Sequence, residues 1–175
     1  MTNTETTHTI PVRLDVDRHA PSFSAAMGRL DAAAIKELDR VDFDPRLREL
    51  VRVRASQLNG CAYCIDMHTK DARGEGETEQ RLYGLSAWRE TPFYTPRERA
   101  ALEWAETLTL MASQHVRDEL YTRAREHFSE AELVSLTLAV IAINGWNRVA
   151  ISFHADVGSY QPATAEAGAP APASV

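Results

Sequence analysis

The strongest constraint on the fold is a long run near the C-terminus that is apolar on nearly every side. The run reads "LVSLTLAVIAINGWNRVAISFH" over 133–154, and it follows "SEAE" at 129–132. Ser129 and Glu132 have the spacing of a capping box, which predicts that a helix begins there. An apolar helix of this kind is buried in a core or at a subunit interface. The Asn144-Gly145 pair allows a kink within it.

Helical signals also dominate the rest of the middle of the chain. "TPRE" at 95–98 is a second capping box with proline at the first helical position. Asp44-Pro45 can open a helix and Asn59-Gly60 can close it. Helices are expected over 22–38, 44–59, 61–73, 78–88, 95–112, 117–127 and 129–154. No period-2 strand or hairpin turn is evident. We therefore expect an all-α fold, a bundle of about six or seven helices.

The two ends differ in composition from the middle. Residues 1–20 are polar and irregular, and 158–175 consist mainly of small residues with proline. The latter composition is typical of a disordered tail. We expect an irregular N-terminal segment over 1–20, one helical domain over 21–157, and a disordered tail over 158–175.

Charge and hydropathy exclude several classes of partner. The formal net charge is −6, and the basic residues are scattered among acidic ones. Nucleic acid and anionic membrane are therefore poor partners. The N-terminus has no apolar signal region, and the longest apolar run, 136–143, is too short to span a bilayer. We expect a soluble, cytoplasmic protein.

The only two cysteines lie three apart, with a histidine close behind them. "NGCAYCIDMH" at 59–68 holds Cys61, Cys64 and His68. A structural crosslink, a metal site and a redox-active dithiol are the alternatives. The crosslink is the weakest, because it closes a very short loop and the cytosol keeps most thiols reduced.

The helix expected over 61–73 places these three side chains on one face. Cys64 and His68 are neighbours one turn apart, so the imidazole can take the thiol proton. Both cysteines lie in the first turn, where the helix dipole favours a thiolate. The dipole favours Cys61 as the attacking thiol and the histidine favours Cys64, so the residues alone leave this open.

A catalytic histidine usually needs an acceptor that orients it. Asp66 and Asp71 lie on the same helix, and Glu49 lies on the preceding one. A turn at 59–60 would fold the two helices together and bring Glu49 to face His68. Because Glu49 lies among apolar residues, we expect a raised pKa that suits it as a base or proton relay.

Three related sites fit less well. A c-type haem site needs a histidine where Ile65 stands, and a thioredoxin-like CxxC follows a strand rather than a helix. Zinc could take Cys61, Cys64 and His68, but no second paired motif supplies a fourth ligand. We therefore expect neither a metal nor a bound organic cofactor.

The stretch "ELVRVRASQLNGCAYCIDMHTKDAR" at 49–73 resembles the core of the alkyl hydroperoxidase D (AhpD)-like proteins of the carboxymuconolactone decarboxylase superfamily. That family's pattern is a glutamate, eleven residues, CxxC, three residues and a histidine. Glu49, Cys61, Cys64 and His68 meet it without a gap, and the similarity extends over most of 25–155.

The resemblance implies an all-helical homo-oligomer, a trimer or hexamer, that reduces organic hydroperoxides. It implies that Cys64 is the peroxidatic thiol, that Cys61 resolves its sulfenic acid, and that His68 and Glu49 relay the proton. It also implies a dithiol reductant, lipoyl or thioredoxin-like. The archetypal AhpD has a histidine where this chain has Tyr63, so its lipoyl-bearing donor does not carry over directly.

Two other functions remain open on this fold. One is a redox-sensing or binding protein whose dithiol cycles with little turnover. The other is a lactone decarboxylase-type activity of the wider superfamily. The decarboxylase branch generally lacks the cysteine pair, so Cys61 and Cys64 argue against it.

Overall fold

The computed structural model describes residues 10–162, and within this range it contains only helices and the segments between them. The helices are α1 (Val16–His19), α2 (Pro21–Arg40), α3 (Pro45–Asn59), α4 (Ala62–Gly74), α5 (Glu79–Gly84), the 3₁₀ helix η1 (Leu85–Glu90), α6 (Pro96–Thr109), α7 (Asp118–His127) and α8 (Glu130–Phe153). The predicted all-α class is confirmed. The short α1 was not expected, and the helix expected over 78–88 is divided into α5 and η1, with a non-helical Ala87 inside η1.

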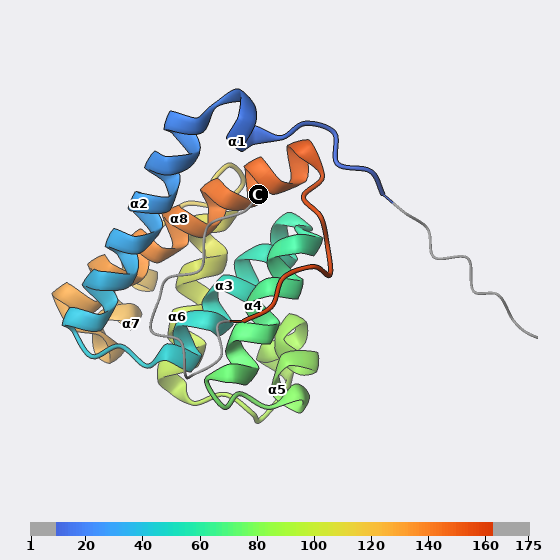
Figure 1. Cartoon of the computed structure of the whole chain (residues 1–175). Helices are drawn as coiled ribbons and strands as arrows, with labels where there is room; N and C mark the ends of the chain where they lie inside the picture. Colours follow the sequence, from blue (N-terminus) through green and yellow to red (C-terminus); the bar gives the residue numbers. More distant parts are fainter. Residues whose placement is uncertain (1–9, 163–175) are drawn as a thin grey trace, which may run out of the picture.

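The apolar C-terminal run forms α8, against which α2, α3 and α6 pack (Figure 1). The capping box at Ser129 and Glu132 is present as predicted. By length and composition α8 is also the one described helix that could cross a membrane. It continues through Asn144 and Gly145 without a break. Gly145 provides space for α2, because a Cβ there would lie 2.7 Å from Met27 Cε.

The apolar stripe of α2 is buried in the C-terminal half of the helix and exposed in the N-terminal half. Ala34 and Leu38 are 2% and 1% exposed, but Phe23 and Leu30 on the same predicted stripe are 52% and 41% exposed. On α8, Val134 and Ile141 are 60% and 52% exposed. These two helices pack against each other, and each presents large apolar side chains to solvent.

After α8 the chain turns back and runs beside α4 (Figure 1, red). His154 has a left-handed backbone, with φ of 54°. The Tyr160 hydroxyl donates to Asp71 Oδ1 at 2.7 Å, and Lys70 Nζ donates to the Tyr160 carbonyl at 2.9 Å. Tyr160, which lies in the segment that we expected to be a disordered tail, thus has defined contacts on α4. The remainder of that assignment, 163–175, lies outside the described residues.

Candidate functional site

The corner between α3 and α4 sets the position of both cysteines. Gly60 ends α3 in the left-handed region, with φ of 74°, where glycine meets no Cβ clash. Cys61 is the N-cap of α4, and its Sγ accepts from Cys64 N–H at 3.3 Å. The Cys61 N–H donates to the Ser56 carbonyl at 3.0 Å. The sequence therefore places Cys61 at the helix start and Cys64 in its first turn, as predicted.

The two cysteines form a disulfide, with their Cα atoms 5.4 Å apart. Each is only 1% exposed, so the structure shows an oxidised pair that is shielded from solvent. The side chains packed into the same cluster are Ala55, Tyr63, Ile143, Ala150 and Ala155.

His68 is fixed by a buried carboxylate from α3. Its Nδ1 lies 2.9 Å from Glu49 Oε2, and the two residues are 4% and 2% exposed. Of the other two predicted acceptors, Asp71 has Oδ2 3.7 Å from the same nitrogen, and Asp66 pairs with Lys70 instead. The structure thus brings Glu49 and His68 together as expected, and their catalytic role stays a prediction.

The expectation of a raised pKa for Glu49 was wrong. Burial raises this pKa, but the hydrogen bond and charge of His68 and the charges of Arg52 and Arg48 outweigh it and hold the pKa at about 2. Arg48 Nε lies 2.9 Å and Arg52 Nη1 3.6 Å from Glu49 Oε1. The apolar neighbours of Glu49 alone would raise its pKa, and His68 and these two arginines reverse that shift. At neutral pH Glu49 is a fixed anion and does not store a proton.

Asp71 is a second carboxylate beside His68, in a different environment. Burial raises its pKa, the hydrogen bond from Tyr160 lowers it, and the Glu49 charge raises it further. The pKa of Tyr160 is raised by burial and by this hydrogen bond. Tyr160 was missed because it lies 89 residues from Asp71 in a segment of tail-like composition.

The arrangement is a poor site for a divalent metal ion. Glu49, His68 and Asp71 offer ligand atoms within 4.8 Å of one another. However, the guanidinium groups of Arg48 and Arg52 already neutralise Glu49, and they would repel a dication. The alternative zinc set needs both cysteine sulfurs, which the disulfide uses.

A buried amide network anchors the end of α3 to α8. Asn59 Nδ2 donates to Asn144 Oδ1 at 2.9 Å and to Asn147 Oδ1 at 2.7 Å. Asn147, which is fully buried, donates to Ser56 Oγ at 3.1 Å. This network holds the corner that carries Cys61. The sequence contained one sign of this network, because Asn144 and Asn147 are polar residues within an apolar helical run. Such residues are buried only when they have hydrogen-bond partners.

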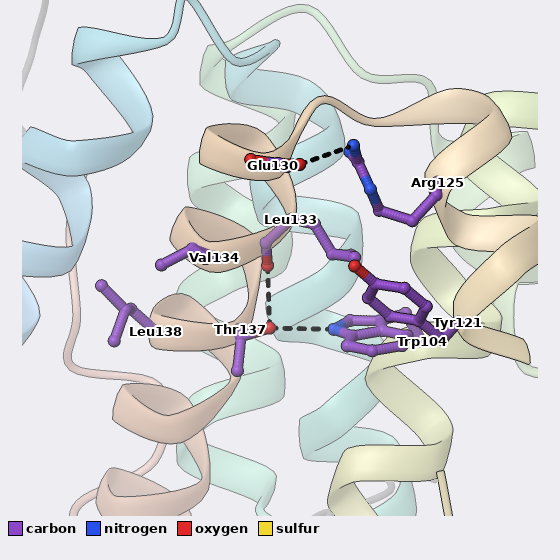
Figure 2. A pocket seen from close by; sticks show the side chains of 8 residues that line it. All are labelled: Trp104, Tyr121, Arg125, Glu130, Leu133, Val134, Thr137 and Leu138. Atoms are coloured by element: carbon purple, nitrogen blue, oxygen red, sulfur yellow. Dashed lines mark hydrogen bonds and ion pairs between the residues drawn. The ribbon is translucent and has the colours of Figure 1, made fainter. Parts of the chain in front are cut away.

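An apolar groove lies on α6, α7 and α8, helices that carry none of Glu49, Cys61, Cys64 and His68 (Figure 2). It is lined by Trp104, Tyr121, Arg125, Glu130, Leu133, Val134, Thr137 and Leu138. The Trp104 indole donates to Thr137 Oγ1 at 3.0 Å, which satisfies the ring N–H. The groove adds apolar surface beside the exposed Val134 on α8.

Comparison with known proteins places this site in a family. Residues 21–107 match the model of the carboxymuconolactone decarboxylase family. The uncharacterized protein YdfG of Bacillus subtilis is 58% identical over 105 residues, which cover 60% of this chain and 71% of YdfG.

Solved structures share the fold. One is a protein of unknown function from Agrobacterium tumefaciens, described as a candidate AhpD antioxidant defence protein, which is 36% identical to this chain. The TM-score is 0.78, and the match covers 84% of this chain and 98% of the Agrobacterium chain. The debrominase Bmp8 is 17% identical, with a TM-score of 0.64 over 81% of this chain and 74% of its own, which shows a common fold alone. Enzymes with this fold therefore differ in activity.

Proposed function

This chain belongs to the carboxymuconolactone decarboxylase family as an AhpD-like member, and from that premise we propose that it is a thiol peroxidase that reduces organic hydroperoxides. The observation that carries the proposal is the buried Cys61–Cys64 disulfide, one turn from a histidine that is fixed by a buried anionic glutamate. The similarity to the Agrobacterium protein, a candidate antioxidant defence protein, supports a role in peroxide removal.

In the proposed cycle, Cys64 is the attacking thiol. His68 is four residues further along α4, and its Nδ1 is engaged by Glu49, so Nε2 remains to take the Cys64 proton. The thiolate attacks the peroxide, forms a sulfenic acid and releases an alkoxide, which takes a proton from His68 to leave as the alcohol. Cys61 then displaces water from the sulfenic sulfur, which forms the disulfide seen here.

Glu49 supports this proton transfer without accepting the proton. Its pKa of about 2 keeps it ionised, so its charge stabilises the imidazolium that forms when Cys64 is deprotonated. The hydrogen bond to Nδ1 also fixes the ring orientation. The relay role expected for Glu49 is therefore proposed here as orientation and charge stabilisation.

A dithiol completes the cycle by returning two electrons and two protons to the disulfide. The cycle needs no bound organic cofactor, and it suits a reducing compartment such as the cytoplasm. The large apolar side chains exposed on α2 and α8 support a homo-oligomer. The family resemblance suggests a trimer or hexamer.

A redox-sensing role is the second candidate, and the burial of both sulfurs favours it. In that case the disulfide would form and be reduced too slowly for useful turnover. Steady-state kinetics separate the two functions, because only a peroxidase consumes many equivalents of peroxide per chain.

The experiment measures consumption of cumene hydroperoxide with dithiothreitol as donor. We expect turnover in the wild type, none above background in Cys64→Ser, and a loss of about 10²–10⁴-fold in His68→Gln, the usual range for a general acid or base. His127→Gln, on α7, is the matched control and should keep wild-type activity. Activity that survives Cys64→Ser would refute the proposal, and stoichiometric oxidation without turnover would favour the sensor.

A further inference from the structure

The disulfide cannot be reduced in the conformation that the structure shows. Thiol–disulfide exchange requires a thiolate to reach one of the two sulfurs, so its rate depends on access. Cys61 and Cys64 are each 1% exposed, and this chain alone provides the cover. Some part of that cover must therefore move in every cycle of a peroxidase, or in every switch of a sensor.

The parts of the cover differ in how easily they can move. Ala55, Ile143 and Ala150 belong to the long helices α3 and α8, and Tyr63 belongs to α4, the helix that carries Cys64. These helices cannot leave the site without unfolding the core. Ala155 lies in the segment 154–162, here called the strap, which has no helix of its own. Since residues 156–159 of the strap are exposed, displacing them uncovers little core surface.

Tyr160 makes two hydrogen bonds that join the strap to α4. The Tyr160 hydroxyl donates to Asp71 Oδ1 at 2.7 Å, and its carbonyl accepts from Lys70 Nζ at 2.9 Å. At the other end, the Ala155 N–H donates to the Ala150 carbonyl at 3.0 Å. Two residues of the strap have a left-handed backbone: His154, just before Ala155, with φ of 54°, and Gly158, between Ala155 and Tyr160, with φ of 97°. Tyr160 is thus the far attachment point of a non-helical segment.

We propose that the strap is the gate to the cysteine pair, and that Tyr160, by donating to Asp71, determines how large a reagent can reach the disulfide. The inference deepens the proposed peroxidase function, because it assigns the residue that controls entry of the dithiol reductant. The role of the gate in a catalytic cycle rests on the proposed function. The access of a reductant to the disulfide can be measured without peroxide.

The test follows reduction of the purified oxidised full-length protein by two reagents of different size. Dithiothreitol closes its own disulfide as it gives two electrons and two protons to the cysteines. Tris(hydroxypropyl)phosphine, which is bulkier, becomes its oxide with an oxygen from water, and two thiols form. Quenched alkylation and intact mass give the rate of each reaction, so catalytic turnover is not needed.

Tyr160→Phe removes the hydrogen bond and keeps the ring. We expect reduction by dithiothreitol to accelerate about tenfold, the effect of losing one hydrogen bond to a charged acceptor. The acceleration should be larger for the phosphine. Tyr83→Phe is the matched control, because the exposed Tyr83 hydroxyl donates to Glu79 at 2.9 Å away from the cysteines. Its reduction rates should equal those of the wild type.

The dependence on reagent size separates a gate from a general loss of stability, since global unfolding would expose the disulfide equally to both reagents. Lys70→Met removes the hydrogen bond to the Tyr160 carbonyl. It should also accelerate reduction, and again more for the phosphine than for dithiothreitol. Wild-type rates in a folded Tyr160→Phe protein would overturn the gate, whatever the peroxidase assay shows. Faster reduction without peroxide turnover would keep the gate and remove the proposed function.

Discussion

Replacing Glu49 by glutamine is expected to remove a stabilisation of the fold that depends on pH. Burial raises the pKa of Glu49, but His68, Arg52 and Arg48 together lower it from 4.5 to about 2. Each unit corresponds to about 1.4 kcal/mol, so folding favours the ionised carboxylate by about 3 kcal/mol. Because the pKa in the folded state is the lower one, this contribution is complete above pH 4.5 and is lost as the pH falls towards 2.

The assay is urea unfolding of the wild type and Glu49→Gln at a series of pH values. The difference between their free energies of unfolding should shrink by about 3 kcal/mol as the pH falls from the neutral range to about 2. Glu119→Gln, at an exposed position on α7, is the control and should leave the pH dependence unchanged.

A difference between wild type and Glu49→Gln that stays constant with pH would refute the reasoning. It would mean that the arginines and His68 do not favour the ionised form of Glu49. Glu49 would then remain available as the proton-storing base that the sequence suggested.

Three further changes test the parts of the fold that position the site. Gly60→Ala should lower the free energy of unfolding by about 1–2 kcal/mol, because φ is 74° there. The control Gly74→Ala, at a helical position, should not destabilise the protein. Urea unfolding measures both variants. Asn147→Leu should cost about 1–3 kcal/mol by the same measurement, because it leaves buried polar partners unpaired. The double variant Val134→Glu and Ile141→Glu should sediment as a smaller species than the wild type, if these exposed apolar residues form the subunit interface; an unchanged sedimentation coefficient would contradict that interface.

Features that depend on local sequence were predictable. The capping boxes at Thr95–Glu98 and Ser129–Glu132, and the turn at Gly60, form as the sequence indicates, because their interactions span only a few residues. The pairing of Glu49 with His68 was also predictable, because the short turn at Gly60 packs the following helix against α3.

Features that depend on side-chain orientation or on residues distant in the sequence were not predictable. The low pKa of Glu49 requires Arg48 and Arg52 to turn towards it, a side-chain choice that helical spacing leaves open. The sequence indicated a possible kink at Gly145 and not its close approach to Met27, because Met27 belongs to α2, far away in the sequence. Tyr160 lies in a segment of tail-like composition, and only the tertiary contact with Asp71 reveals it.

The most direct test of the central claim is a free-thiol count with intact mass, before and after one equivalent of an organic hydroperoxide. It compares the fully reduced wild type with Cys64→Ser. The proposed cycle predicts that the wild type rapidly loses both thiols and two hydrogens, while Cys64→Ser keeps its remaining thiol. Oxidation of the wild type no faster than that of a free thiol, or equal oxidation of Cys64→Ser, would contradict a peroxidatic Cys64.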